Sequence, residues 1–286
     1  MAVGVYITYK VLDFADLTVD GTMCTGGAVC VMMMLKGINP WVSLLCAVLA
    51  GMLAGLITGI LHTSMGIPAI LSGILTQLAL YSINLKIMGK SNQAISVDKF
   101  PLLVSLRNVK TGPFFKNSIV VGVIFCVILV GILYWFFGTE LGCSLRATGC
   151  NPNMSRAQGI DTKRNIVIGL MISNGIVALS SALNAQYLGF ADINMGRGAI
   201  VIGLAAVIIG GVIFEKIFRN FALKLFAVVI GGVIYYVVIQ AVICMGFDSD
   251  LLKLLSAVVV AIFLAVPYWK QNYFAKAKNK GGVKNA

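Results

Sequence analysis

The chain has 286 residues, of which 59% are hydrophobic and only 11% are charged. So few ionisable side chains cannot cover the surface of a soluble globule of this size, which excludes a soluble enzyme and predicts an apolar surface that faces lipid. The formal net charge is +12, but the Lys and Arg residues lie between and after hydrophobic runs, as membrane anchors and topology signals do, so they do not indicate nucleic-acid binding.

Hydrophobic runs of about 20 residues predict helices that cross the bilayer, because a backbone polar group in hydrocarbon must be paired within its own segment. The opening run, 1–12, is too short to cross, and we expect it to be the second half of a longer first helix that starts upstream. The full-length candidates that follow are 40–61, 67–85, 117–138, 165–187 and 225–245. Shorter candidates are 22–35, 199–214 and 251–267. The runs predict an all-α integral membrane protein, a polytopic bundle of about eight to nine transmembrane helices.

The predicted domain organisation is a single transmembrane domain over residues 1–286. Its first half is 1–138, and a polar loop, 139–164, separates this half from the second, 165–267. The basic tail, 268–286, is better suited to anchoring on anionic lipid than to forming a binding domain.

The Lys and Arg residues also predict the orientation, since cytoplasmic loops carry the excess of positive charge. Placing the loop 143–164 and the tail inside assigns most of these residues to the cytoplasm and predicts a multi-pass protein of the plasma membrane. The segment 86–116 conflicts with this rule because it is basic and falls outside. We keep the orientation for two reasons. The number of crossings fixes the side of each loop relative to the others, and a basic outer loop is suited to an acidic partner.

No residue pattern predicts a catalytic, metal or cofactor site. The seven cysteines form no CxxC pair and are expected to be small apolar side chains. His62 lies at a helix end, where an interfacial side chain is a better interpretation than a metal ligand or general base. Gly89-Lys90-Ser91 resembles the end of a phosphate-binding loop, but the glycine required five residues before Gly89 is Asn84. Any ATP and Mg²⁺ are therefore expected on a separate subunit.

A short motif occurs twice and predicts an inverted repeat. Residues 14–19 read Phe-Ala-Asp-Leu-Thr-Val and residues 190–195 read Phe-Ala-Asp-Ile-Asn-Met, each near the start of a short predicted helix. An odd number of predicted crossings separates the copies, so they face opposite sides of the membrane. Short or Gly-interrupted segments at matching positions of two halves are typical of the translocation pathway of a transporter. The alternative is a chance match in a chain of restricted composition.

The polar residues of these motifs and of one span are the candidate pathway residues. A carboxylate in or near the bilayer is costly unless it is paired, wetted or caps a helix. Asp20 and Asn194 precede short helices and are suited to cap them, so capping and pathway lining both remain open. Uncharged polar groups within a span either join helices or line a polar route. The candidates are Asp16, Asp20, Asn174, Asn184, Gln186, Asp192 and Asn194.

The loop 142–161 is the least hydrophobic stretch between two predicted spans and is expected to be exposed. Asn151 before Pro152 predicts the start of a short helix that Gly159 ends. Carrying Met154 and Arg156, this helix is suited to dock against a partner on the cytoplasmic face.

This loop and the span after it carry motifs of a known family. They are Leu145-Arg146-Ala147-Thr148-Gly149-x-Asn151, Arg156-Ala157-x-Gly159-Ile160, Gly169-Leu170, Ser173-Asn174 and Ala178-Leu179-Ser180. The chain resembles the permease subunits of ABC importers of the branched-chain amino acid and ribose class. It most resembles uncharacterised permeases encoded beside substrate-binding proteins of the tryptophan/tyrosine type. The resemblance extends through 189–196 and back to 16–21 and 81–85, and it departs at the N-terminus, where such permeases have a complete first helix.

The resemblance implies a permease subunit of an ATP-driven importer that works with a separate ATPase and an extracytoplasmic substrate-binding protein. In such permeases the loop corresponding to 144–161 inserts into the ATPase, which implies coupling contacts at Arg146, Asn151, Met154, Arg156 and Gly159. A second copy of the chain is expected to complete the pathway as a homodimer, since one chain of this length makes half of such an importer. The resemblance favours an amino acid, and an aromatic one among them, over a sugar or nucleoside.

Two other classes of function are alternatives to an ABC permease. An ion-coupled secondary transporter could use Asp16 and Asp192, and it would transport without an ATPase under an ion gradient. A membrane-embedded lipid enzyme would need titratable groups that converge on one face, and the sequence provides no such set.

Overall fold

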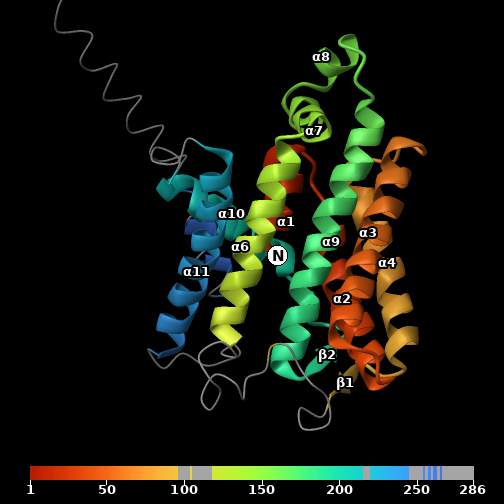
Figure 1. Ribbon diagram of the computed structural model, residues 1–286, viewed down its shortest axis with the longest axis vertical. Helices are drawn as coiled ribbons and strands as arrows, with labels where there is room; N and C mark the ends of the chain where they lie inside the picture. Colours follow the sequence, from red (N-terminus) through yellow and green to blue (C-terminus); the bar gives the residue numbers. More distant parts are fainter. Residues whose placement is uncertain are drawn as a thin grey trace, which may run out of the picture. The chain divides into compact units, whose positions relative to one another are not determined.

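The computed structural model describes residues 1–95, 104, 118–214 and 220–244, with isolated positions between 254 and 265 (Figure 1). The chain divides into two compact units, Met1–Ile200 and Val201–Ala286, which we describe separately. The predicted helix 251–267 and the basic segment 86–116 lie largely outside the described residues, and the tail 268–286 lies wholly outside them.

Six helices in the described part of the chain are long and apolar enough to cross a membrane, and α10 (Ala199–Phe214) is a shorter apolar helix. The six are α2 (Thr18–Leu35), α3 (Pro40–Thr63), α4 (Ala69–Met88), α6 (Ser118–Phe137), α9 (Thr162–Leu188) and α11 (Phe221–Cys244). Each coincides with a predicted span, so the all-α polytopic membrane fold is confirmed.

Two helices, α9 and α2, begin earlier than predicted, and side chains that cap them explain the difference. The carboxylate of Asp161 accepts hydrogen bonds from the backbone N–H groups of Lys163 and Arg164, so α9 begins three residues before the predicted 165. Asp16 accepts from the N–H of Thr18, so α2 begins before the predicted 22. Hydrophobicity alone places neither start, because both caps lie outside the apolar runs.

The N-terminal segment packs against α9 and then turns back. It consists of α1 (Ala2–Tyr6) and a π-helical turn, η1 (Ile7–Val11). The Ser173 hydroxyl of α9 donates to the carbonyl of Gly4, at 2.8 Å. After η1 the chain reverses at Asp13, whose φ is +52°, and residues 14–17 lead into α2 without forming a helix.

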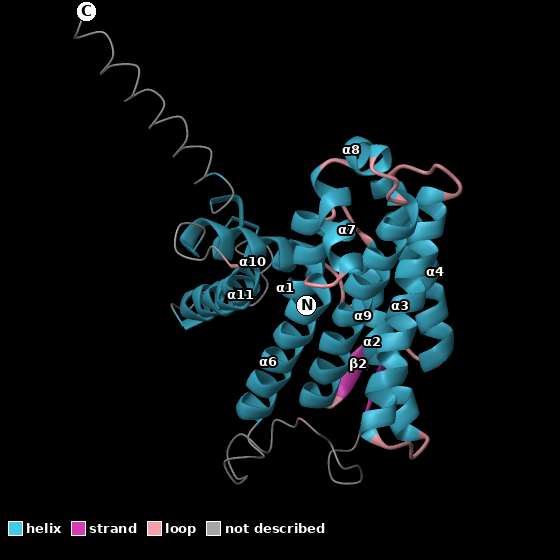
Figure 2. Cartoon of the chain, turned by 45° about the horizontal axis from the view of Figure 1, so that its top comes forward, coloured by secondary structure: helices cyan, strands magenta, loops and turns pink. Residues whose placement is uncertain are grey.

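Helix α9 is the central element of the first unit, where it packs against α3, α2 and α1 (Figure 2). Small residues allow the close approach: Gly26 of α2 and Gly55 of α3 face the backbone of α9 at Ala178 and Leu170. Helices in lipid are held together by such close packing, because lipid tails leave little hydrophobic driving force between them.

The two ends of α9 differ in what covers them. At its C-terminal end, β1 (Asn92–Ala94) pairs antiparallel with β2 (Phe190–Asp192), with Gln93 opposite Ala191. At its N-terminal end lie α7 (Glu140–Cys150) and α8 (Pro152–Ala157) (Figure 1).

Helix α7 corrects the expectation that the whole of 142–161 is an exposed loop. Thr139 caps α7, and Leu145 and Thr148 are buried. The Asn165 amide of α9 donates to the hydroxyls of Ser144 and Thr148, each at 2.9 Å. The polar residues of this segment form hydrogen bonds with α9. In the amino-acid sequence, a helix with such polar residues cannot be distinguished from an exposed loop.

In the second unit, α10 and α11 approach closely through glycines. Gly210 of α10 faces the backbone of Ala227, and Gly231 of α11 faces that of Ala206. Tyr235, Ile209 and Ala205 form a buried cluster there.

Replacing Gly55 by leucine should lower the free energy of unfolding by about 2 kcal/mol, because the new side chain would meet the α9 backbone at Leu170. Thermal unfolding of the purified chain in detergent measures the change. Gly131→Leu is the matched control, since a Cβ on Gly131 of α6 meets nothing within 4 Å. Equal unfolding midpoints for the two variants would contradict close α3–α9 packing.

Candidate functional site

A buried polar cluster lies at the middle of α9. Asn174, near the midpoint of this helix, donates its amide Nδ2 to Oδ2 of Asp16 at 2.8 Å and accepts from the Thr22 hydroxyl at 2.7 Å. Oδ1 of Asp16 accepts from the Thr18 N–H at 2.9 Å. Asp16 is 3% exposed and Asn174 is fully buried. The cluster thus holds a carboxylate inside the bundle and uses it to cap α2.

Hydroxyl groups extend this cluster towards α3 and α4. The Thr18 and Thr58 hydroxyls lie 2.7 Å apart, and Thr58 donates to the Thr76 hydroxyl at 2.9 Å. Three helices are therefore joined by side chains that also bond within their own helix, as Thr58 does to Ala54. Such hydroxyls act mainly to join helices inside a bundle.

Asp20 performs a second capping role, on a different helix from its own. Its Oδ2 accepts from the N–H of Gly198 at 3.0 Å and its Oδ1 from the N–H of Ile200 at 2.9 Å. These groups lie at the start of α10, where N–H groups lack helical partners and the helix dipole favours a negative charge. Asp20 therefore stabilises the start of α10 from α2.

The two copies of the repeated motif approach this region from opposite ends of α9. The first descends from Leu12, beside Gly169, to Asp16, beside Asn174. The second returns from Leu188 to Met195, whose sulfur lies 3.9 Å from the Ser181 hydroxyl. Gly196 then lies against the backbone of Asp20. This opposed approach is what an inverted repeat requires, and the repeat itself stays a prediction.

The expected capping by Asp20 and Asn194 requires correction. Asp20 does not cap α2, whose N-cap is Leu17, because it lies in the first turn and points to α10. Asn194 is exposed, and its N–H donates to Oδ1 of Asp192 at 2.6 Å in the turn after β2. The residues that do the capping are Asp16 for α2 and Asp20 for α10.

The remaining candidate pathway residues are dispersed. Gln186 is fully buried near the C-terminal end of α9, with its Nε2 3.4 Å from the sulfur of Cys30. Asn184 is half-buried on the same helix. The structure brings Asp16 together with Asn174 and places Asp20 beside the turn that contains Asn194. Of the seven candidates, Asp20 lines one of the two pockets described below.

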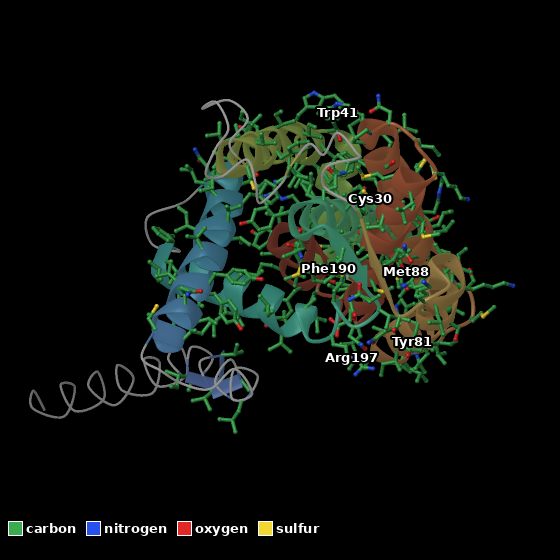
Figure 3. All side chains as sticks on the ribbon, turned by 90° about the horizontal axis from the view of Figure 1, so that it is seen from below. Cys30, Trp41, Tyr81, Met88, Phe190 and Arg197 are labelled. Carbon is green, nitrogen blue, oxygen red and sulfur yellow. The ribbon has the colours of Figure 1, made fainter. Side chains whose placement is uncertain are left out.

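A polar pocket of about 180 Å³ lies between α2, α4 and the segment that leads into α10. We call it the α2–α4 pocket. Figure 3 shows Tyr81 of α4 and Arg197 near one another on this side of the bundle. Its lining residues are Asp20, Gly21, Cys24, Gln77, Leu78, Tyr81, Asn84, Ile193 and Arg197.

Of these residues, only Asp20 is a candidate from the sequence. Asn84 carries a signal that could have identified it, since it is an uncharged amide within a predicted apolar span, as Asn174 is. Arg197 gave no such signal, because it lies between helices where a basic residue suggests a lipid anchor.

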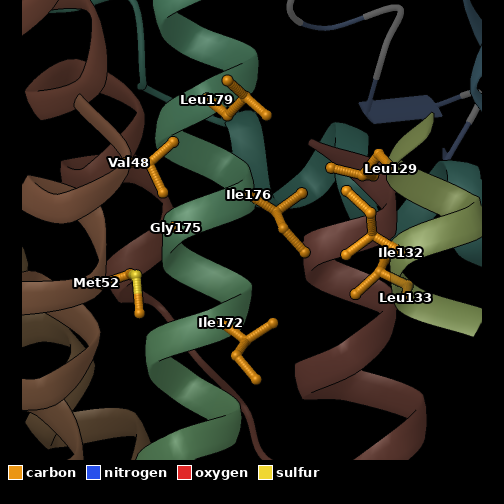
Figure 4. A pocket seen from close by; sticks show the side chains of 9 residues that line it. All are labelled: Val48, Met52, Leu129, Ile132, Leu133, Ile172, Gly175, Ile176 and Leu179. Carbon is orange, nitrogen blue, oxygen red and sulfur yellow. The ribbon is translucent and has the colours of Figure 1, made fainter. Parts of the chain in front are cut away.

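A second pocket, of about 220 Å³, lies between α3, α6 and α9 and is lined by apolar side chains such as Val48, Leu129 and Ile176 (Figure 4). It offers no side-chain hydrogen-bond donor or acceptor, so it provides no means of recognising a polar solute.

The predicted docking helix is present as α8. The side chain of Asn151 accepts from the N–H of Met154 at 3.1 Å, and Gly159, with φ of +80°, ends the turn. Met154 is 60% exposed. The Nε of Arg156 donates to the Thr162 hydroxyl at 2.9 Å, which fastens α8 to the first residue of α9. Arg146 is exposed on α7, so the five predicted coupling residues lie at one end of the unit.

Comparison with known proteins places the chain among permeases. The family model described as "Branched-chain amino acid transport system / permease component" matches residues 1–267. The chain is 43% identical over 265 residues to a tyrosine transport system permease protein of Clostridioides difficile, across 93% of this chain and 86% of that protein. It is 32% identical over 205 residues to a D-allose transport system permease protein of Escherichia coli, across 70% and 59%. A nucleoside ABC transporter permease protein of Lactococcus lactis is 26% identical, across 62% and 58%. No solved structure matches the chain significantly.

Replacing Asn174 by leucine should lower the free energy of unfolding by about 2 kcal/mol, because Asp16 and Thr22 would each lose a hydrogen bond inside the bundle. Chemical denaturation in detergent measures the loss. Asn184→Leu, on the same helix and half-buried, is the control and should change the unfolding free energy by less than about 0.5 kcal/mol. Similar losses for both variants would show that the Asp16–Asn174 pair is energetically unimportant.

Proposed function

We propose a function from the premise that this chain belongs to the family of permease components of branched-chain amino acid transport systems. It is accordingly an integral protein of the cell membrane and the membrane subunit of an ABC importer. Beyond the family, we propose that it carries an amino acid, and an aromatic one in particular, and that a separate ATPase supplies the energy. An extracytoplasmic binding protein delivers the solute, and two copies of the chain enclose the pathway.

The exposed helix α8 carries the proposal of ATPase coupling. It projects beyond α9 and presents Met154, a large apolar side chain that is 60% exposed. An exposed apolar side chain surrounded by polar residues suits a protein contact. Its neighbours Asn153 and Arg156 are exposed and polar. The proposed occupant of this surface is a cleft on the ATPase subunit, with Asn151 and Gly159 fixing the two ends of the helix.

Movement of α8 would reach the middle of the bundle through α9. Arg156 is bonded to Thr162, and Asn165 is bonded to Ser144 and Thr148 of α7, so α7, α8 and the start of α9 form one connected block. A rigid helix then links this block to Asn174 and its partner Asp16. A displacement imposed on α8 by the ATPase would therefore be felt where α2 begins.

The substrate proposal rests on the relatives. The tyrosine transport system permease is similar to this chain over most of both lengths, whereas the D-allose relative aligns over a smaller share of each. We therefore assign this chain an amino acid, with tyrosine as the solute to test first. The ATP and Mg²⁺ of the transport cycle would be bound by the ATPase subunit.

Met154→Asp should abolish capture of the partner ATPase and reduce ATP-driven uptake at least tenfold, since a charge would be forced into an apolar cleft at a cost of about 2 kcal/mol or more. The measurement co-expresses the chain with a P-loop ATPase subunit and the binding protein from the same genome and purifies the complex by a tag on the permease. It then follows L-tyrosine uptake into proteoliposomes that contain the complex and the binding protein.

Met65→Asp is the matched control. Met65 is 67% exposed in the turn that follows α3, near the same end of α9, and it should leave ATPase capture unchanged. Retained capture and uptake in the Met154→Asp variant would overturn the coupling role of α8. Uptake of L-tyrosine by the permease alone under a proton or sodium gradient would instead favour an ion-coupled carrier.

A further inference from the structure

The α2–α4 pocket contains a buried amide that makes no hydrogen bond of normal geometry, although the Cys24 thiol, a weak donor, lies beside it. Asn84 of α4 is fully buried, and neither its Nδ2 nor its Oδ1 has a hydrogen-bond partner within 3.5 Å. Buried amides are almost always bonded, and one that is not costs stability. Since Asn84 lines the pocket, its unused donors and acceptor are available to whatever enters there.

The pocket also presents charges of both signs. The carboxylate of Asp20 is half-buried and fixed by the N–H groups of Gly198 and Ile200, which leaves further lone pairs on its two oxygens. The guanidinium of Arg197 is exposed and makes no hydrogen bond or ion pair within the described part of the chain. A carboxylate and a guanidinium that line one pocket without neutralising each other are suited to a ligand with two opposite charges.

Gln77 adds a second amide, and the rest of the lining is apolar or aromatic. Cys24, Leu78 and Ile193 provide apolar wall, and Tyr81, 45% exposed, adds an aromatic ring. The volume, about 180 Å³, corresponds to about six water molecules at roughly 30 Å³ each, so a small solute fits and a drug-sized one does not. A few polar groups in a mainly apolar cavity are the usual composition of a solute site.

The position of the pocket is appropriate for a solute entering from the side opposite α8. Asp20 and Cys24 lie in the first turns of α2, which begins at the level of Asn174. Asn84 lies towards the end of α4 that leads to β1, and β1 pairs with β2 beyond the C-terminus of α9. The pocket therefore occupies the half of the unit that is remote from α7 and α8.

We propose that the α2–α4 pocket binds a free amino acid in its zwitterionic form, with the ammonium group at Asp20, the carboxylate at Arg197 and a polar side-chain group at Asn84. This inference rests on the proposed function as an amino acid importer and adds a solute site within the permease itself. A sugar would use the amide but leave both charges without a counterpart. A metal cation would use Asp20 but would be repelled by Arg197.

The test measures binding of radiolabelled L-tyrosine to the full purified chain in lipid nanodiscs, without the binding protein. Tyramine lacks the carboxylate, 4-hydroxyphenylpropionate lacks the ammonium group, and phenylalanine lacks the hydroxyl. Each should compete at least about tenfold more weakly than unlabelled L-tyrosine, the loss expected when a charged or buried hydrogen bond is not made. D-allose and sodium chloride should not compete.

Substitutions connect two of the three ligand groups, the carboxylate and the hydroxyl, to a residue. Arg197→Gln should weaken L-tyrosine binding about tenfold and leave tyramine binding unchanged, because tyramine has no carboxylate to lose. Asn84→Leu should weaken L-tyrosine binding by a similar factor and remove the preference over phenylalanine. It should also raise the thermal unfolding midpoint, because an unpaired buried amide is replaced by an apolar side chain of similar size. A merely structural Asn84 would give the opposite shift.

Control variants lie elsewhere on the chain. Arg164→Gln changes an exposed arginine at the start of α9, and Tyr134→Leu changes an exposed tyrosine of α6. Both should bind L-tyrosine as the unmodified chain does.

Two failures can be distinguished. Saturable L-tyrosine uptake by the complete importer, with no binding to the permease alone and no effect of Arg197→Gln or Asn84→Leu on uptake, would overturn the pocket while leaving the proposed function intact. Equal competition by D-allose, or loss of binding only in the control variants, would also overturn it. No ATP-driven uptake of any amino acid by the complete importer would overturn the proposed function, whatever the permease binds.

Discussion

The structure of the first unit depends on how the N–H groups at two helix starts are satisfied, one buried inside the bundle at α2 and one partly exposed at α10. In hydrocarbon such groups have no water to bind, and each costs several kcal/mol when unpaired, by rough estimate. Asp16 supplies the acceptor for α2, and Asp20 supplies it for α10. Because Asp16 is in turn held by Asn174, a single helix, α9, fixes where the N-terminal segment turns back and where α2 begins. The two aspartates therefore determine the path of the chain as much as apolar packing does.

This arrangement makes α9 the mechanical link of the unit. At a rise of 1.5 Å per residue, the twelve residue steps from Thr162 to Asn174 span about 18 Å. One end of that distance is bonded to α8 through Arg156, and the other is bonded to Asp16 and Thr22. Glycines at the contacts of α9 with α2 and α3 leave little room for these helices to move independently. A coupled shift of packed helices suits this geometry better than an independent rotation of α9.

The sequence predicted the spans and the short helix α8 because their signals are local. Hydrophobic length defines α3, α6 and α11, and the pair Asn151-Pro152 defines α8. It did not predict α7, because the polar residues that bond this helix to α9 are also typical of a loop. It also failed to assign the capping aspartates to the right helices, since the bonds from Asp20 to Gly198 and Ile200 join residues far apart in the chain. Hydrogen bonds between residues far apart in the chain produce no periodic pattern in the sequence. A single sequence therefore identifies the polar residues but does not predict which of them are bonded to each other.

The contrast between Asn174 and Asn84 separates a structural amide from one suited to binding. Both are fully buried in apolar helices, and composition alone treats them alike. Asn174 uses its donor and its acceptor on three neighbouring residues, and it lines neither of the two pockets described above. Asn84 uses neither group and faces a cavity shared with Asp20 and Arg197. The buried polar groups at the contacts of α2, α3 and α9 are hydrogen-bonded, and the amide of Asn84 is an exception. This exception supports the proposal that a ligand supplies the missing hydrogen bonds of Asn84. Proteins accept such local instability where function requires it.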